Sequence, residues 1–334
     1  MLPLLRKSED NMFNRMRHYT YYFLALVGLL CLAACGGKRQ KAERIISVTI
    51  EPQRYFAERI AGEHFAIHCV VPAGQSPETY DPTPQQMVQI GESEAYLRIG
   101  SIGFELAWME AIKQNNPHLQ IFDLSEGMPL LKGEEEEAEE GHEHEHEHEH
   151  AHAHDHAPEA ATEAEHHHHH HGGVDPHIWS SIHGARIVAQ NTLAALQALD
   201  PANADTYTAN YQQVVALIDS TEAVINTLLK PLAHRSFIIY HPALTYLAAE
   251  YELEQLCIEM DGKEPSPAQL KSLVETAQAH HTKVVFVQQE FDQKNAELIA
   301  KETGCQLTPI NPLAYDWSRE MIRIAKALAD GEVD

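Results

Sequence analysis

Short apolar runs rich in β-branched residues recur along this chain and alternate with stretches of helical periodicity. Each run is continuous rather than alternately polar and apolar, which is typical of parallel strands that helices cover on both faces. The runs fall into two groups of four, so the sequence predicts two α/β domains, each built on a parallel sheet. The predicted strands are 45–50, 67–71, 96–99, 121–124, 237–240, 256–260, 284–287 and 306–310, with helices such as 267–279 and 294–302 between them.

A long helical pattern connects the two groups of strands. It begins at Asp200-Pro201, an N-cap residue followed by proline at the first helical position, and it ends near Pro231. A helix over 202–230 would be about 40 Å long. It is either one more core helix or, as we expect, a stiff connection that limits movement between the domains. Its predicted apolar face consists of Tyr207, Tyr211, Val214, Ile218, Ile225 and Leu228.

The front of the chain has the three regions of a secretory signal. Two arginines precede an uncharged, mostly apolar run over 19–34, and small residues lead into Cys35. The sequence Leu32-Ala33-Ala34-Cys35 resembles the lipobox of bacterial lipoproteins, in which the cysteine is acylated. We therefore expect a signal peptide over 1–34 and lipid on Cys35, which would hold the protein on a bacterial membrane, facing the periplasm or the cell exterior. A plain membrane anchor is the alternative.

A strongly biased tract separates the two groups of strands. Between positions 134 and 173 there are 14 carboxylates and no lysine or arginine, and 14 of the 24 histidines lie there. Since the tract has almost nothing apolar to bury, we expect a mobile loop that binds metal weakly at several places. A pH-buffering or solubilising run is the alternative. The formal net charge of −25 also argues against a nucleic-acid partner. The histidines concerned are His142, His144, His146, His148, His150, His152, His154, His156, His166, His167, His168, His169, His170 and His171.

Three polar residues lie next to prolines, either where a predicted strand ends or where structured sequence resumes after the tract. Ligands of open parallel sheets bind beyond the carboxyl ends of the strands, so we expect these residues to meet. Glu78, His177 and His241 form a set of two imidazoles and one carboxylate, a known zinc combination that leaves a position for water. The carboxylate shifts the preference toward manganese or iron(II), although zinc still binds such a site more tightly. Asp175 or Asp316 is expected to orient an imidazole.

Four motifs occur in this chain in the order found in a known family. From about 45 to 328, the chain resembles the ZnuA-type substrate-binding proteins of zinc-uptake ABC transporters, in the cluster A-I or TroA-like group. The resemblance implies two α/β domains joined by a long backbone helix, a divalent metal held in the cleft between them, and delivery of that metal to a permease and its ATPase. The motifs are Gly74-Gln75-Ser76-Pro77-Glu78-Thr79-Tyr80, Asp175-Pro176-His177-Ile178-Trp179, Tyr240-His241-Pro242-Ala243-Leu244-Thr245-Tyr246 and Asn311-Pro312-Leu313.

The same resemblance assigns roles to single residues. His177 and His241 match two imidazole ligands of the family, whereas Glu78 stands where many members have histidine. Asn311 stands where aspartate is common and offers only a neutral carbonyl, so we expect it to be a weak ligand. Zn²⁺ is the expected cargo, and Mn²⁺ or Fe²⁺ is the alternative.

Three cysteines remain beyond Cys35, in a compartment that we expect to be oxidising, so at least one of them is unpaired. We expect a disulfide between Cys257 and Cys305, which fall near the cysteine pair that links the second domain in some zinc members of the family. Cys69 is expected to be a buried thiol.

Two other functions compete with transport. His144-Glu145-His146-Glu147-His148 fits the HExxH pattern of zinc proteases, but any His-Glu repeat produces that pattern, so we expect no enzyme activity. A surface metal buffer or adhesin without a transporter is the other alternative. We expect a monomer. The predicted organisation is a signal peptide over 1–34, a tether over 35–43, an N-terminal domain over 44–181 that includes the 134–173 loop, a helical region over 182–233, and a C-terminal domain over 234–334.

Overall fold

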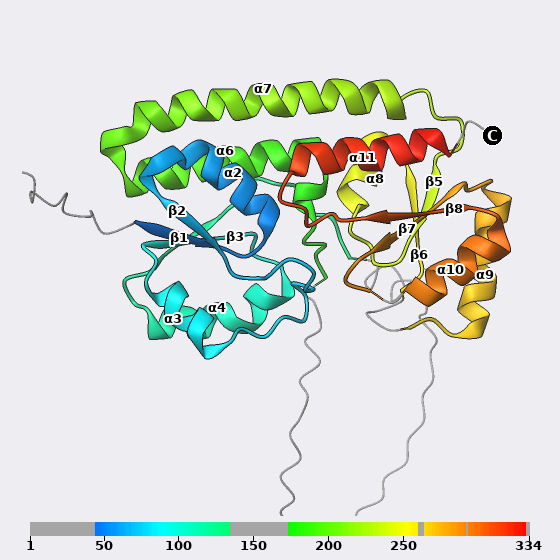
Figure 1. Ribbon diagram of the computed structural model, residues 1–334, viewed down its shortest axis with the longest axis horizontal. Helices are drawn as coiled ribbons and strands as arrows, with labels where there is room; N and C mark the ends of the chain where they lie inside the picture. Colours follow the sequence, from blue (N-terminus) through cyan, green and yellow to red (C-terminus); the bar gives the residue numbers. More distant parts are fainter. Residues whose placement is uncertain (1–43, 134–172, 260–263, 292, 332–334) are drawn as a thin grey trace, which may run out of the picture. The chain divides into compact units, whose positions relative to one another are not determined.

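The computed structural model describes residues 44–133, 173–259, 264–291 and 293–331, and it contains two four-stranded parallel sheets (Figure 1). The predicted α/β class and all eight predicted strands are confirmed. The strand orders are β2-β1-β3-β4 and β6-β5-β7-β8. The first sheet comprises β1 (Ile45–Val48), β2 (Ala66–Cys69), β3 (Ala95–Arg98) and β4 (Gln120–Asp123), and the second comprises β5 (Ser236–Ile239), β6 (Glu254–Cys257), β7 (Val284–Gln288) and β8 (Gln306–Ile310).

Several predictions concern residues outside these described ranges. They are the signal peptide over 1–34, lipidation of Cys35, the tether over 35–43, and the 14 histidines between His142 and His171. Within the described ranges, no helix combines the length and the apolar character that crossing a membrane requires.

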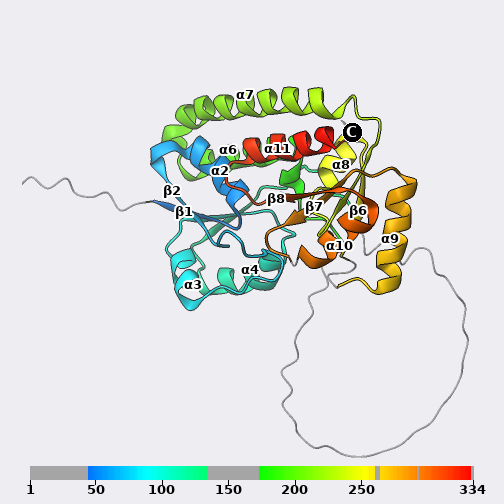
Figure 2. The ribbon, with the colours of Figure 1, turned by 45° about the vertical axis from the view of Figure 1, so that its right-hand side comes forward.

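The second sheet is covered by helices on both faces, as its continuous apolar strands predict. Phe237 and Ile239 of β5 belong to a core shared with α11 (Trp317–Asp330), whereas Ile238 between them belongs to a separate core with α9 (Pro267–Ala279) and α10 (Gln293–Thr303). Figure 2 shows α9 and α10 beside this sheet. Neighbouring side chains of a strand point to opposite faces, so every residue of β5 is buried. The remaining helices of the sheets are α2 (Glu51–Ala61), α3 (Pro84–Gly91), α4 (Gly103–Asn115) and α8 (Thr245–Tyr251).

Helix α9 matches its predicted bounds because local signals define its start. Ser266 accepts a hydrogen bond from Gln269 N at 3.4 Å, and the Gln269 side chain accepts one from Ser266 N at 2.8 Å. This reciprocal capping satisfies two backbone donors that the first turn leaves without a helical partner. Pro267, whose missing N–H costs nothing at this position, follows directly.

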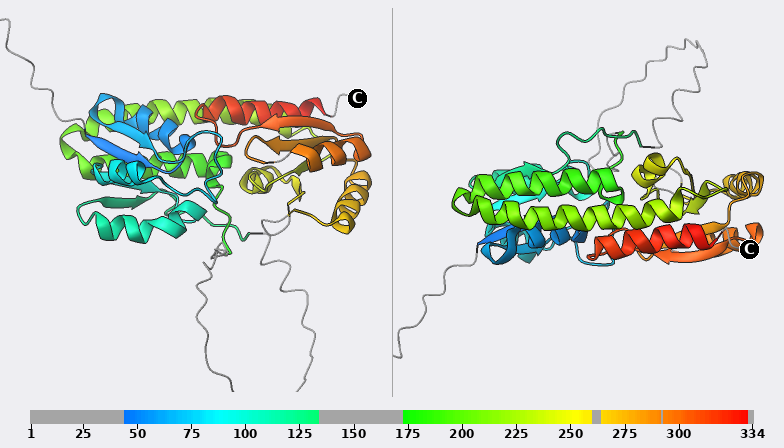
Figure 3. Two further views of the ribbon diagram at one scale, coloured as in Figure 1. Left: turned by 60° about the horizontal axis from the view of Figure 1, so that its bottom comes forward. Right: turned by 90° about the horizontal axis from the view of Figure 1, so that it is seen from above.

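The predicted long helix is α7 (Ala204–Leu229), which follows α6 (Ile182–Leu199) and a single 3-10 turn over Pro201–Asn203. Its 26 residues give a length of about 39 Å. Helix α7 packs against α2, which covers the first sheet, and against α11, which covers the second (Figure 3). The prediction of a helix that connects the two halves is confirmed. All six residues of its predicted face contact the core: Tyr207, Val214, Ile218 and Ile225 are buried, and Tyr211 and Leu228 are half-buried. Thr221 and Leu229 complete the buried set.

The predicted disulfide between Cys257 and Cys305 does not form. Cys257 ends β6 and Cys305 immediately precedes β8, and these strands lie at opposite edges of the second sheet with β5 and β7 between them. Three strand spacings of about 4.8 Å separate the two edges, whereas a disulfide needs Cα atoms within about 7 Å. The Cys305 thiol instead donates to the Thr282 carbonyl oxygen at 3.1 Å.

Candidate metal centre

A pocket is lined by residues that follow strands of both sheets. Glu78 lies beyond β2, His241 beyond β5 and Glu290 beyond β7, and His177 comes from the described segment that begins at residue 173. Glu78, His241 and Glu290 therefore lie past the carboxyl ends of strands, where ligands of open parallel sheets are expected to gather. Among the described residues that line the pocket, none is lysine or arginine.

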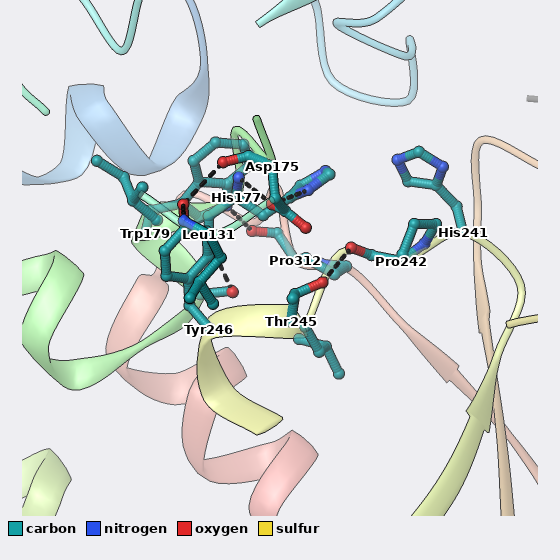
Figure 4. A network of polar contacts seen from close by, with 12 residues as sticks. Leu131, Asp175, His177, Trp179, His241, Pro242, Thr245, Tyr246 and Pro312 are labelled. Atoms are coloured by element: carbon teal, nitrogen blue, oxygen red, sulfur yellow. Dashed lines mark hydrogen bonds and ion pairs between the residues drawn. The ribbon is translucent and has the colours of Figure 1, made fainter. Parts of the chain in front are cut away.

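His177 is held by its neighbour Asp175 (Figure 4). Asp175 Oδ1 accepts a hydrogen bond from His177 N at 2.7 Å and lies 2.9 Å from His177 Nδ1. Both side chains are buried. Burial alone lowers the pKa of His177, but the charge and hydrogen bond of Asp175, with the charges of Glu78 and Glu259, outweigh burial and raise it. Since Nδ1 is bound to Asp175, Nε2 is the nitrogen left for a metal, and the predicted orienting role of Asp175 has the geometry it requires.

His241 is held in a matching way from the second sheet. Its Nδ1 lies 3.2 Å from Glu259 Oε2. Gln288 fixes its backbone, accepting from His241 N at 3.4 Å and donating to His241 O at 2.7 Å. The ring of Phe291 stacks on the His241 imidazole with centroids 5.0 Å apart and planes inclined by 23°. His241 Nε2 is buried without a hydrogen-bond partner, so a lone pair is held toward the pocket at a desolvation cost.

The two imidazoles are neighbours. Their ring centroids lie 5.2 Å apart and their planes are inclined by 71°. Two histidines that are each tied through Nδ1 to a carboxylate and placed edge to face resemble the carboxylate–histidine pairs that orient metal ligands.

Glu78 is positioned by the start of helix α4. Its Oε2 accepts a hydrogen bond from Gly103 N at 2.9 Å, and Phe104 N donates to Pro77 O at 2.9 Å. A Cβ atom at position 103 would lie 2.2 Å from Glu78 O, so this close approach requires glycine. The amino end of a helix also favours a negative charge beside it. The loop after β2 therefore presents Glu78 from a fixed backbone.

A buried carboxyl group, Glu105, supports the loop that meets Glu78. It accepts hydrogen bonds from Ile99 N at 3.0 Å, from Gly100 N at 2.5 Å and from the Thr49 hydroxyl. Burial raises the pKa of Glu105 to about 7, although these hydrogen bonds lower it. The burial of Glu105 is not predicted from the sequence, because no local pattern distinguishes a buried glutamate in the first turn of a helix from an exposed one.

Replacing Glu105 with glutamine should flatten the dependence of stability on pH. The pKa of Glu105 is higher in the folded protein than its usual value of 4.5. Between pH 4.5 and 7 this carboxyl group is therefore protonated more often in the native state than in the unfolded state. The stabilisation from protonated Glu105 is therefore complete below pH 4.5 and is lost as the pH rises to about 7, a loss of up to about 3 kcal/mol. Denaturant unfolding of the apo protein between pH 5 and 8 measures this difference. Glu110→Gln, an exposed change on the same helix, should leave the slope as in the wild type; an unchanged slope in Glu105→Gln would contradict the assignment.

Asn311 is not brought into the pocket. Its Oδ1 accepts a hydrogen bond from Leu313 N at 3.1 Å, which closes a turn, while the next two residues, Pro312 and Leu313, do line the pocket. Asp316 caps α11 by accepting from Arg319 N at 3.3 Å, so the structure gives it no part in orienting an imidazole. A short polar side chain beside proline favours a turn of this kind.

The polar side chains of the pocket lie near one another but do not form a complete metal-binding geometry. In the part of the chain that the structure describes, no group of three His, Cys, Asp or Glu side chains is placed to hold a metal ion as it stands. Side-chain rotation or a small approach of the two sides is needed before one ion touches all of them.

Two glutamates near the imidazoles, Glu259 and Glu290, are not among the site residues predicted from the sequence. Each lies within three residues of the end of a strand, at the same edge as His241. The rule that selected His241 therefore also applies to them, but they lack an adjacent proline and lie outside the quoted motifs.

Tyr246 of α8 contacts the chain both just before and just after the His/Glu tract. Its hydroxyl accepts from Leu131 N at 3.1 Å and donates to Asp175 O at 2.9 Å (Figure 4). Lys132 and Val174 form an antiparallel bridge just beyond. The residues that flank the tract are thus paired with each other, and Val174 of this pair lies three residues before His177.

Comparisons with known proteins agree with this architecture. A family profile described as "ZnuA: Zinc-uptake complex component A periplasmic" matches residues 46–330. The high-affinity zinc uptake system protein ZnuA of Bacillus subtilis (strain 168) is 27% identical over 302 residues, which cover 87% of each chain. The iron ABC transporter substrate-binding lipoprotein MtsA of Streptococcus pyogenes serotype M1 is 22% identical over 295 residues, covering 84% of each. A crystal structure of ZnuA superimposes with a TM-score of 0.73 and 33% identity, covering 86% of this chain and 98% of that one.

Proposed function

The chain belongs to the ZnuA family of zinc-uptake components, and on that premise we propose that it captures Zn²⁺ outside the cytoplasm and delivers it to the permease of an ABC transporter. One observation carries the choice of site. Two imidazoles 5.2 Å apart, each bound through Nδ1 to a carboxylate, line a pocket that also contains Glu78. Neutral imidazole and carboxylate are the donors that Zn²⁺ prefers when no cysteine is present.

In this proposal each residue has a separate task. His177 and His241 bind through Nε2, and Glu78 binds through a carboxylate oxygen. Asp175 and Glu259 keep the rings in the orientation that faces the ion. Apolar lining from Pro77, Ala243, Phe291, Pro312 and Leu313 excludes water around the ligands, which strengthens their attraction for a dication. Closing the pocket forms the bonds, and reopening it at the permease releases the ion.

A manganese- or iron-binding protein of the same family is the second candidate, because one relative is named as an iron ABC transporter substrate-binding lipoprotein. The carboxylates of the pocket favour these harder ions more than a set of three imidazoles does. Zinc remains our first choice since it binds nitrogen and oxygen sites more tightly than Mn²⁺ or Fe²⁺. Equilibrium competition on the purified full chain tests this: an equal mixture of Zn²⁺ and Mn²⁺ should leave zinc in the tight site, and retention of manganese would reverse the choice.

The setting of the protein is also part of the proposal. We propose that lipid on Cys35 tethers it to the membrane, in line with the lipoprotein name of MtsA. We further propose that it acts as a monomer without enzyme activity, with an N-terminal domain over 44–181 and a C-terminal domain over 234–334. Mass spectrometry of the membrane-extracted chain tests the anchor, since an acylated cysteine at the new amino terminus adds the mass of its acyl chains.

Deleting residues 134–172 should remove weak metal sites and leave the tight one. The deletion joins Gly133 to Gly173 between the paired residues Lys132 and Val174, and two glycines suit a two-residue hairpin turn. The fold around His177 should therefore be kept. Titration calorimetry should show one tight equivalent of zinc in both proteins and additional weak binding in the wild type alone. Loss of the tight equivalent on deletion would place that site in the tract and refute the pocket.

A further inference from the structure

We infer that Glu290 is a fourth metal ligand, which completes the donor set of Glu78, His177 and His241 around the captured dication. The inference rests on the proposed function and adds the residue that fills the remaining position. It begins from the pocket, where Glu290 is among the lining residues although no motif of the sequence includes it.

The carboxylate of Glu290 is only partly satisfied within the protein. Its Oε1 has almost no solvent exposure and no hydrogen-bond partner. A desolvated carboxylate oxygen is costly unless a cation or donor meets it. His241 Nε2, in the same pocket, is buried without a partner as well. When Nδ1 of His241 donates to Glu259, both Glu290 Oε1 and His241 Nε2 are acceptors. One cation can satisfy both of these atoms, whereas hydrogen bonding would require a separate donor for each.

The backbone around Glu290 is tied to the His241 ligand. Gln288, two residues earlier, bonds both the N–H and the carbonyl of His241. Phe291, the next residue, stacks on the His241 ring and on Tyr240, with centroids 5.0 Å and 5.2 Å apart. The main chain on each side of Glu290 is thus anchored to the histidine, so the carboxylate and the imidazole approach an ion as one unit.

Charge and coordination number favour the same assignment. With Glu290, the direct ligands carry two negative charges, which neutralise a dication and reduce the cost of burying it. Two imidazoles and two carboxylates also supply the four donors of a tetrahedral zinc site. Asn311 adds no donor to this set, because its Oδ1 accepts a hydrogen bond from Leu313 N and its side chain does not line the pocket. Glu290 therefore supplies the carboxylate that Asn311 cannot.

The test compares Glu290→Gln with Glu297→Gln in the full chain purified in detergent. Glu297 is exposed on α10, so its change removes the same charge from the same region without touching the pocket. Competition with a chromophoric chelator should show zinc affinity at least about 100-fold weaker in Glu290→Gln, at or above the loss that follows removal of an outer partner, and unchanged in Glu297→Gln. The visible absorption of bound Co²⁺ should also shift in Glu290→Gln alone, because one oxygen ligand is replaced.

Thermal unfolding of the apo proteins guards against misfolding. Apo Glu290→Gln should be at least as stable as the wild type, since the change removes the charge from a carboxylate whose buried Oε1 has no hydrogen-bond partner. Wild-type zinc affinity and an unchanged Co²⁺ spectrum in Glu290→Gln would overturn the inference. If His241→Ala still loses zinc in that case, the proposed function stands without Glu290; if the wild type binds no zinc, both fail.

Discussion

Alanine in place of His241 abolishes the tight equivalent of bound zinc, which is the largest effect we expect. The change removes one of two nitrogen donors, and the loss should exceed the about 10- to 100-fold that follows removal of an outer partner such as Glu259. His177→Ala should have the same result, because in the proposed site both rings bind the same ion. Chelator competition on the purified full chain gives the affinity, and elemental analysis gives the stoichiometry.

His183→Ala provides the matched control. His183 is an exposed histidine near the start of α6, outside the pocket lining, so its removal subtracts an imidazole without changing the site. It should bind zinc as the wild type does. A tight equivalent that survives both His177→Ala and His241→Ala would refute the proposed centre, whatever the control shows.

Trp179→Ala should cause the largest loss of stability, about 4 kcal/mol. Trp179 is 1% exposed, its Nε1 donates to Pro312 O at 3.0 Å, and its carbonyl accepts from Trp317 Nε1 at 2.6 Å. Truncation of the Trp179 side chain leaves a large cavity and removes the hydrogen-bond donor to the buried Pro312 carbonyl. Zinc affinity should fall too, because the Trp179 ring packs beside His177 with centroids 5.2 Å apart. Denaturant unfolding of the apo protein measures the first effect and chelator competition the second.

Trp108→Ala is the comparison for this variant. Trp108 lies on α4 and is half-buried, and its Nε1 donates to Asp81 Oδ1 at 3.3 Å. Its removal should cost far less free energy of unfolding. Equal losses in the two variants would mean that the buried Trp179 ring and its hydrogen bond to Pro312 O add no more to stability than the half-buried Trp108 ring.

Most of the fold could be predicted from local patterns. Continuous apolar runs identified all eight strands, because a strand buried on both faces has little choice of residue type. The helix over 267–279 was predicted to the residue because Ser266 and Pro267 define its start chemically. The long helix was predicted two residues too early, since Pro201 begins a 3-10 turn that precedes α7.

The site was predictable only in part. Prolines and strand ends singled out Glu78, His177 and His241, and the structure places all three on one pocket. Contacts between distant segments were not encoded in any local pattern: Glu259 reaches His241 across 18 residues, and Gln288 across 47. The Cys257–Cys305 prediction failed for the same reason, because the order of strands in a sheet decides which residues are neighbours and the linear spacing of two cysteines does not.

Helix α7 is one continuous helix that packs against α2 along its first half and against α11 along its second half. We expect a helix of that kind to resist bending at its middle, so movement on metal binding should be confined to the loops around the pocket. A transporter that docks on this protein would then distinguish the loaded form from the empty one by the contour of those loops, not by a change in the length or bend of the whole molecule.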